Sequence, residues 1–161
     1  MFVSNSSTII LLAKATLLSK FLDSVKSVAT TSIIQDEILK KDSFENLLIK
    51  KEVERGRIKV ETIEEKNYSD IRKQFRLDEG EASTYALYIN GKYKAILTDD
   101  KELIKLCRIE SIAFISAMAA VVKLFKEKII KKKEALDKIE ALQGYGRYSS
   151  DVYNYFKNLV K

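Results

Sequence analysis

The chain has 161 residues, of which 46% are hydrophobic and 32% are charged. This composition is typical of a globular protein, and the length suits one domain that buries roughly 70% of the surface its unfolded chain exposes. We therefore expect a single domain over residues 1–161. No apolar run reaches the ~20 residues of a membrane-spanning helix, and Lys14 interrupts the apolar N-terminal segment, so we expect neither a membrane protein nor a signal peptide.

The charged residues and the single cysteine narrow the possible functions. The 29 basic and 23 acidic side chains give a net charge of +6, which favours a polyanionic partner without identifying it. The densest basic run, residues 123–133, is best explained as a solvated helix end. Cys107 is the only cysteine and histidine is absent. This excludes an internal disulfide, a typical zinc site and histidine acid–base catalysis, and it fits a cytoplasmic protein.

The first part of the chain alternates between strand and helix patterns. We expect a strand over residues 2–4, a helix with Ile10, Ala13, Leu17 and Phe21 on one face, a strand over residues 25–31, a helix over residues 32–51 that Ser32 caps, and a strand over residues 57–63. Gly56 ends the second helix. The last strand alternates polar and apolar residues, which indicates a half-exposed strand at an edge of the sheet.

The second part continues the alternation and then becomes helical. We expect helices over residues 67–75 and 79–89, a central strand over residues 93–97, a helix over residues 100–108 that Asp99 caps, a strand over residues 112–115, and helical segments over residues 117–125, 135–142 and 152–160. Strands that alternate with helices indicate an α/β fold with a parallel sheet and right-handed crossovers. The C-terminal part, from about residue 116 to residue 161, is helical and must pack on that core or on a second subunit.

Acidic or amide side chains follow several of the predicted strands and turns. They are Asn5, Glu37, Glu81, Asp99 and Asp100. In an open parallel sheet, residues just beyond the carboxyl ends of the strands converge although they are distant in sequence. Each acid also has a structural explanation: a helical ion pair with Lys40 or Lys41 for Glu37, the helix macrodipole for Glu81, and capping for Asp99. Together, however, carboxylates crowded at one edge repel one another, and a bound cation relieves that repulsion.

The chemistry of such a cluster follows from its oxygen donors. Oxygen ligands favour Mg²⁺ or Mn²⁺. Neither a GxxxxGKS/T nor a GxGxxG pattern occurs in the sequence, so a nucleotide cofactor has no support. Acidic clusters that hold hard cations serve phosphoryl chemistry, and a basic protein around such a cluster suits a nucleic-acid backbone.

Motifs along nearly the whole chain resemble those of PIN domains. FVSNSSTIILLAK resembles their opening Val-Ser-Asp-Thr-Ser segment, TSIIQDEI their second acidic motif, LDEGEASTYAL their Gly-Glu-Ala motif and ILTDDKELIKLC their Asp-Asp motif. SIAFISAMAAVVKLFKEKII and GYGRYSSDVYNYFKNLV are similar to the C-terminal part of a prokaryotic PIN subgroup, in which a glycine often replaces Ser116. The resemblance implies a three-layer domain with strand order 3-2-1-4-5. It also implies a metal-dependent ribonuclease of VapC type, often the toxin of a VapBC-type toxin–antitoxin pair.

The resemblance also implies a set of site residues. Carried over by position, Asn5, Glu37, Glu81 and Asp100 would be catalytic and surround Mg²⁺ or Mn²⁺, Asp99 would be a further catalytic candidate, and Ser7 would help to order the site. Asn5 departs from the family, whose first acidic residue is normally aspartate. Asparagine still offers a carbonyl oxygen but removes one negative charge from the site.

Two functions are consistent with the sequence. The first is a metal-dependent endoribonuclease in which Lys101, Lys105 or the run at residues 123–133 binds phosphates. The second is a catalytically weak or inactive PIN-like module that binds RNA or a protein. The expected partners are RNA, an antitoxin protein and a second copy of the chain. The last helix is the candidate dimer surface, although we favour internal packing of its apolar residues Val152, Tyr155 and Phe156.

Overall fold

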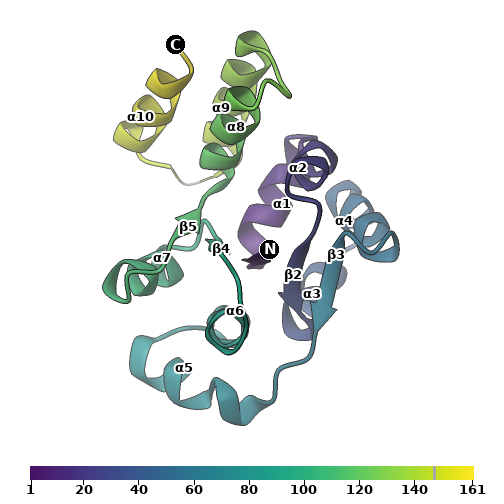
Figure 1. The fold of residues 1–161 in the computed structure, drawn as a ribbon, viewed down its shortest axis with the longest axis vertical. Coiled ribbons are helices and arrows are strands. Elements are labelled where there is room, and N and C mark those ends of the chain that lie inside the picture. Colours follow the sequence, from purple (N-terminus) through teal and green to yellow (C-terminus); the bar gives the residue numbers. More distant parts are fainter. Residues whose placement is uncertain (147) are drawn as a thin grey trace.

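A parallel five-stranded sheet forms the centre of the computed structural model, which describes residues 1–146 and 148–161 (Figure 1). The strands are β1 (Phe2–Ser4), β2 (Val28–Thr31), β3 (Ile58–Glu61), β4 (Ile96–Leu97) and β5 (Phe114–Ile115). Their order is β3-β2-β1-β4-β5, and every neighbouring pair is parallel. The α/β class and the strand order predicted from the sequence are therefore confirmed, as is the edge position of β3.

Helices cover both faces of this sheet and extend beyond it at the C-terminal end. They are α1 (Ser6–Lys14), α2 (Leu18–Val25), α3 (Ser32–Leu39), α4 (Phe44–Glu54), the 3-10 turn η1 (Glu65–Asn67), α5 (Ser69–Phe75), α6 (Glu79–Asn90), α7 (Lys101–Ile109), α8 (Ala117–Lys126), α9 (Lys132–Tyr145) and α10 (Ser150–Val160). The larger core cluster draws on α1, α2, α8 and α9, and a smaller one draws on α6 and α7. None of the helices in the described residues is long and apolar enough to cross a membrane.

Two of the predicted helices are each divided into two. The apolar face predicted over residues 10–21 belongs to α1 and α2, which are separated at Thr16, a residue with a φ of 57°. The helix predicted over residues 32–51 is α3 followed by α4, because Ser43 caps a new helix by accepting a hydrogen bond from the amide of Asn46 at 3.2 Å. The helical spacing of apolar residues continues across both breaks, so periodicity alone predicts one helix in each case.

The boundaries around β2 also differ from the prediction. The strand begins at Val28, whereas Val25 is the last residue of α2. The cap of α3 is Thr31, whose Oγ1 accepts a hydrogen bond from the amide of Ile34 at 3.1 Å, and the predicted cap Ser32 is the first residue of the helix. Adjacent hydroxyl residues are both good caps, so the sequence does not distinguish them.

The register of the central strands determines which residues meet at the carboxyl edge of the sheet. Ser4 of β1 pairs with Leu97 of β4, and the amide of Asn5 donates to the carbonyl of Leu97 at 2.9 Å. Asn5 and Thr98, the residues that follow these two strands, therefore lie side by side. This edge of the sheet carries the candidate site described below.

The C-terminal helices pack as predicted only in part. Phe156 packs against the larger core cluster, as expected. Internal packing was the wrong prediction for Val152 and Tyr155, which are 39% and 60% exposed. Helix α10 lies against α8 and α9, so the tail covers these helices rather than the sheet (Figure 1).

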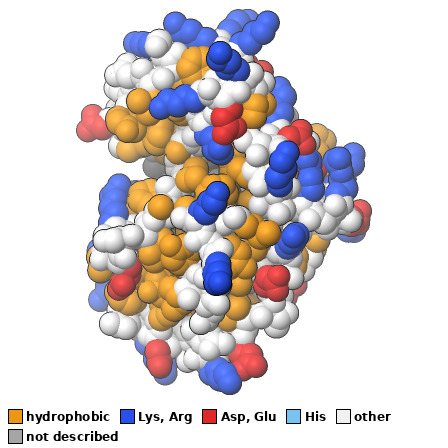
Figure 2. Space-filling model, viewed as in Figure 1, with side chains coloured by type: hydrophobic (Ala, Val, Ile, Leu, Met, Phe, Trp, Pro, Cys, Tyr) orange, Lys and Arg blue, Asp and Glu red, His pale blue; other side chains and the backbone are white. Residues whose placement is uncertain are grey.

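The basic run at residues 123–133 spans the end of α8 and the beginning of α9. Figure 2 shows Lys and Arg side chains gathered at the top of the molecule, where these two helices are joined. In Figure 1, β2 and β3 point away from this end. The run therefore forms an exposed basic surface apart from the carboxyl edge of the sheet.

Beside β3, one buried carboxylate holds two arginines. Glu52 of α4 is 5% exposed, and its Oε2 accepts from Nε of Arg57 at 2.6 Å, while its Oε1 accepts from Arg55 at 3.3 Å. Arg57 also pairs with Asp23 of α2. This network therefore ties α4 and the residue before β3 to α2.

We expect Glu52→Gln to lower the free energy of unfolding by about 1–3 kcal/mol, because it leaves Arg57 without its buried counter-charge. Urea denaturation monitored by circular dichroism measures the change. Glu64→Gln is the matched control, since the Glu64–Lys66 pair is exposed, at 68% and 77%, and such pairs contribute little. Equal stability of the two variants would contradict a structural role for the Glu52 network.

Candidate functional site

The centre of the candidate site is a contact between the ends of β1 and β4. Asn5 is 1% exposed, and its Nδ2 donates a hydrogen bond to Oδ2 of Asp100 at 2.6 Å. The same nitrogen lies 3.5 Å from Oγ1 of Thr98, which also accepts from the amide of Asp100 at 3.1 Å. Thr98 thus holds both residues in place. The strand register brings together two positions that are 95 residues apart in the sequence.

Glu81 enters the site from the first turn of α6. Its amide donates to Oδ1 of Asp78 at 2.7 Å, and its Oε2 accepts from the amide of Asp78 at 3.2 Å, which together form a capping box. The side chain is buried at 7% exposure. Burial, followed by the nearby charges of Asp100 and Asp78, raises the pKa of Glu81 from its ordinary value of 4.5 to about 8. The metal-free site therefore favours a protonated Glu81 at neutral pH.

Glu37 approaches the site from α3, across Gly80 of α6. A Cβ on Gly80 would lie 2.5 Å from Oε1 of Glu37 and 2.8 Å from Cδ1 of Ile34. Any larger residue at position 80 would therefore push the Glu37 carboxylate out of its present position. Partial loss of hydration of its carboxylate is the main cause that raises the pKa of Glu37; the charges of Asp78 and Asp100 add to the shift, while Lys40 opposes it. Glu37 therefore shares the electrostatic field of the other acids, although its side chain is largely exposed.

Asp99 has a different role from the one predicted. It was expected to cap α7, but the residue at the N-cap of that helix is Asp100, and its side chain makes no capping hydrogen bond. Instead, Oδ2 of Asp99 accepts from the amide of Ala117 at 3.0 Å, at the first turn of α8, and from Oγ1 of Thr8 at 2.6 Å. The capping prediction is wrong because the chain turns after β4 and directs Asp99 toward α8.

Ser7 lies behind this arrangement. Its Oγ accepts a hydrogen bond from the amide of Asp99 at 2.9 Å. The residue therefore fixes the backbone at the Asp-Asp pair from the first turn of α1. An ordering role for a hydroxyl at this position was an implication of the PIN resemblance, and the contact gives that role a physical basis.

The structure thus brings Asn5 directly to Asp100, places Glu81 close to Asp100, and keeps Glu37 within the same field of charge. Among the described residues, no three Asp, Glu or Cys side chains are gathered closely enough to hold a metal ion together. Asp99 is directed elsewhere. The side-chain atoms at this edge that can bind a metal are all oxygens; the Asn5 amide nitrogen cannot act as a ligand. Oxygen ligands suit a hard cation such as Mg²⁺ or Mn²⁺.

Sequence reasoning missed some residues that shape the site. Asp78 could have been found, because Asp78 and Glu81 have the spacing of a capping box just before an apolar helix. Thr98 directly precedes the Asp-Asp pair, but no motif marks its bridging role. Tyr148, whose hydroxyl donates to Oδ1 of Asp99, lies 49 residues further along the chain, and the sequence carries no signal for this contact.

The basic residues predicted to bind phosphates lie on α7. Lys101 is the first residue of this helix, directly after Asp100, and both Lys101 and Lys105 are exposed. Lys105 also lines a groove of about 360 Å³ between α5 and α7. Lys101 is therefore next to the acidic edge of the sheet, and Lys105 lies one helical turn further along α7, unlike the basic run at residues 123–133.

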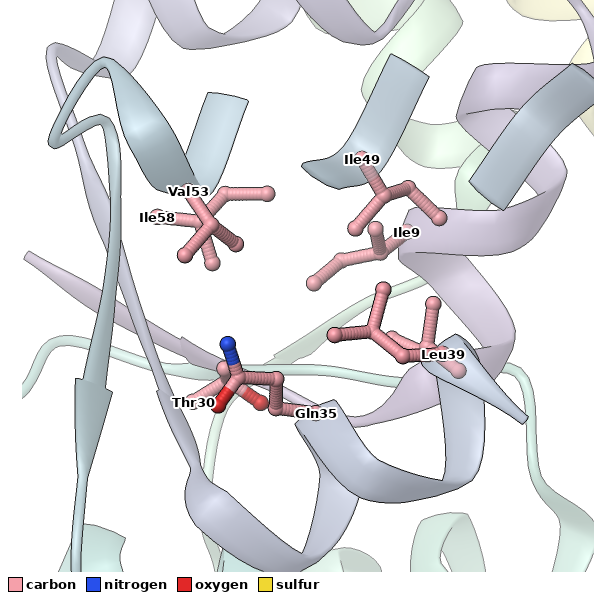
Figure 3. A pocket seen from close by; sticks show the side chains of 8 residues that line it. Ile9, Thr30, Gln35, Leu39, Ile49, Val53 and Ile58 are labelled. Carbon is pink, nitrogen blue, oxygen red and sulfur yellow. The ribbon is translucent and has the colours of Figure 1, made fainter. Parts of the chain in front are cut away.

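A second, apolar cavity lies on the other side of α3 and contains none of the acidic side chains (Figure 3). Its lining residues are Ile9, Thr30, Gln35, Ile38, Leu39, Ile49, Val53 and Ile58. These side chains come from α1, α3, α4 and the strands β2 and β3. The cavity is a packing feature between helices and sheet, and it adds no chemistry to the acidic site.

The carboxyl edge of this parallel sheet carries a buried glutamate beside a half-buried aspartate, and ligands of open parallel sheets bind at that edge. Comparison with known families identifies the domain: the model of the DUF3368 family, described as a PIN domain, matches residues 1–161. The chain therefore belongs to the PIN-domain family. A search of curated proteins finds no match.

PIN domains typically bind Mg²⁺. The residues of this chain fit such an ion in their chemistry, because Glu37, Glu81, Asp100 and the carbonyl of Asn5 offer hard oxygen donors. The raised pKa values of Glu37 and Glu81 have the same origin, since burial and neighbouring carboxylates both disfavour uncompensated negative charge. A divalent cation bound at this edge would compensate that negative charge.

We expect the metal-free protein to lose stability as the pH rises from about 4.5 to about 8. The folded protein keeps a proton on Glu81 up to its pKa of about 8, whereas the unfolded chain releases it near 4.5, so deprotonation favours unfolding across this interval. Glu37 acts in the same direction. Glu81→Gln should flatten the decline and raise Tm at pH 8 by about 3 °C or more, measured by calorimetry in EDTA.

Glu54→Gln is the matched control, because Glu54 is exposed at the end of α4, remote in sequence from the acidic motifs. It should leave the pH dependence of Tm unchanged. A wild-type protein whose Tm rises steadily between pH 4.5 and pH 8 in EDTA would show that Glu81 is not a protonated, buried acid.

Proposed function

We propose that this PIN domain is an endoribonuclease that depends on Mg²⁺ or Mn²⁺ and is weakened by Asn5. The observation that carries the proposal is the acidic pair at the carboxyl edge of the sheet, the buried Glu81 and the half-buried Asp100, with Asn5 directly against Asp100. Acids whose burial raises their pKa strongly are found at functional sites more often than elsewhere in proteins. The family membership supports the same assignment.

The residues have distinct roles in this proposal. Glu37, Glu81 and Asp100 would supply carboxylate oxygens to the ion after moving closer together than they lie in the metal-free structure. Asn5 would supply its amide oxygen after turning away from its present hydrogen bond. The chemistry that Mg²⁺ or Mn²⁺ would supply there is a lowered pKa of an attacking water and neutralisation of charge on the phosphate. Glu81 has to release its proton before it can act as an anionic ligand, so binding is linked to pH. Thr98 accepts a hydrogen bond from the amide of Asp100 and so holds the backbone of that residue.

The groove between α5 and α7 supports RNA as the substrate. It is lined by Gln74, Phe75 and Arg76 on one side and by Glu102, Lys105, Leu106 and Ile109 on the other. Arg76 and Lys105 suit phosphates, and the ring of Phe75 suits a stacked base, whereas Glu102 reduces the positive charge. The α7 wall begins directly after Asp100, and the α5 wall ends at Arg76, two residues before the Asp78 cap of α6. A single strand that leaves the acidic site can thus follow this groove.

A toxin role extends the proposal to the partner. As the toxin of a VapBC-type pair, the protein would act in the cytoplasm and would be inhibited by a small antitoxin protein. This part rests on the resemblance of the motifs and of the C-terminal segment. Growth arrest on induction, relieved by the product of an adjacent small gene, is the observation that would support it.

A second candidate is a PIN-like module that binds RNA or a protein without cleaving. The contact between Nδ2 of Asn5 and Asp100 favours it, because a neutral amide donor satisfies a carboxylate that would otherwise require a cation. In this case the groove is retained while the ion is held weakly. The two candidates differ in whether RNA is cleaved in the presence of metal.

We expect the purified protein to cleave RNA with Mn²⁺ and to stop when EDTA is added. Asp100→Asn and Glu81→Gln should each reduce the cleavage rate by about 100-fold or more, because each removes an anionic ligand. Cleavage of a fluorescent single-stranded RNA measures the rate. Asp36→Asn is the matched control, since Asp36 is an exposed acid beside Glu37. RNA that is bound but stays intact under all metal conditions would support the second candidate instead.

Asn5→Asp tests the weakening directly. The added carboxylate supplies a further anionic oxygen, so Mn²⁺ affinity and cleavage should both rise, by about tenfold. Without metal the same change should lower Tm, because it replaces the hydrogen bond to Asp100 with a like charge. Calorimetric titration with Mn²⁺ and melting in EDTA give the two quantities. If metal affinity, cleavage and apo Tm all stay unchanged, the assignment of Asn5 to a metal site is wrong.

A further inference from the structure

The carboxylate of Asp99 accepts hydrogen bonds from three separate parts of the chain. Oδ2 accepts from Oγ1 of Thr8 on α1 at 2.6 Å and from the amide of Ala117 on α8 at 3.0 Å. Oδ1 accepts from the hydroxyl of Tyr148, in the segment between α9 and α10. A carboxylate offers about four acceptor positions, so most of this one is already used. Asp99 therefore joins α1, α8 and the C-terminal tail and is poorly placed to be a metal ligand.

The position of Asp99 determines that of its neighbour Asp100. The amide of Asp99 donates to Oγ of Ser7 at 2.9 Å, and the amide of Asp100 donates to Oγ1 of Thr98 at 3.1 Å. Because the peptide group that links the two aspartates is planar, a rotation of Asp99 reorients the backbone of Asp100. The anchors of Asp99 thus set the direction in which the Asp100 carboxylate meets Asn5.

Tyr148 is itself held firmly where it meets Asp99. Its ring packs against the larger core cluster, and a Cβ on Gly146 would lie 2.5 Å from Cε2 of that ring. The close approach of ring and backbone therefore requires glycine at this position. Burial and the Asp99 carboxylate raise the pKa of Tyr148, so the hydroxyl stays protonated and remains a donor.

Helix α10 begins just after Tyr148 and is held to the rest of the protein along one side. Val160 is its fully buried residue, and Tyr153 and Phe156 pack partly buried against the larger core cluster. The helix lies against α8 and α9. Through Tyr148, this tail thus touches Asp99 at the acidic edge of the sheet.

We propose that Tyr148 is a positioning residue of the acidic site: its hydroxyl, acting through Asp99, couples the docking of α10 to the orientation of Asp100. The coupling is a property of the fold. The consequence for metal binding is that Mn²⁺ affinity falls when the tail is released. This consequence rests on the proposed function. Because Tyr148 touches Asp99 and not the reacting groups, it acts by positioning and not by catalysis.

Tyr148→Phe tests the coupling, because it removes the hydroxyl and keeps the ring. Tyr153→Phe is the matched control: its ring also packs against the larger core cluster, and among the described residues it is not one of the donors to Asp99. Native-state amide hydrogen exchange in EDTA is the first measurement. Tyr148→Phe should speed exchange at the amides of Asp99, Asp100 and Ala117 by about tenfold and leave β3 unchanged, whereas Tyr153→Phe should affect α10 alone.

Calorimetric titration with Mn²⁺ is the second measurement, and Tyr148→Phe should raise the Kd several-fold while Tyr153→Phe leaves it unchanged. Unchanged exchange at Asp99, Asp100 and Ala117 in Tyr148→Phe would overturn the coupling. Faster exchange there with an unchanged Mn²⁺ Kd would overturn its consequence for the site. If the wild-type protein binds no Mn²⁺, the proposed function fails, and the exchange rates in EDTA still decide the coupling.

Discussion

The arrangement of the molecule depends on how negative charge is accommodated at the carboxyl edge of one parallel sheet. The register of β1 and β4 brings Asn5 and Asp100 together, and α6 adds Glu81. Carboxylates that lie close together and lose all or part of their hydration are unfavourable as anions, so each needs a hydrogen-bond donor, a proton or a cation. Asp100 has the Asn5 amide, Glu81 keeps a proton, and Asp99 has the donors of α1, α8 and the tail. The acids therefore differ in role because they are neutralised in different ways.

The same contacts that stabilise the fold also prepare the site. The capping box of α6 satisfies amides at the helix N-terminus, and it fixes the Glu81 side chain at the edge of the sheet. Gly80 lets α6 approach the Glu37 carboxylate more closely than an alanine would allow. A substitution at these positions changes helix stability and site geometry together. For that reason, the contribution of Glu81 to function is separable from its contribution to folding only when both are measured.

The sequence predicts the sheet and the acidic positions well because both depend on local patterns. Apolar runs define the strands, and acids or amides follow the strands and turns at motif spacing, which indicates a parallel sheet with these side chains at its carboxyl edge. The order β3-β2-β1-β4-β5 was implied by the resemblance to PIN domains, and with that order β1 and β4 are neighbours, so Asn5 meets Asp100. Helix breaks are less visible, because the apolar spacing continues across Thr16 and Ser43. The direction of Asp99 cannot be read locally at all, since its donors Thr8, Ala117 and Tyr148 are 91, 18 and 49 residues away. A side chain fixed by tertiary contacts carries no signal in its own neighbourhood.

At position 5, the stability of the metal-free protein and the proposed metal binding require opposite kinds of side chain. As a neutral donor, Asn5 satisfies Asp100 and lowers the charge at an edge where Glu81 is already protonated. Those features stabilise the metal-free protein. A hard cation requires the opposite, namely more anionic oxygen and fewer competing donors. Asparagine at this position therefore shifts the balance toward a fold that is stable without metal, and any ion that binds must displace both a hydrogen bond and a proton. The affinity of the site for metal is thus set as much by what the ion must replace as by the number of oxygens that it meets.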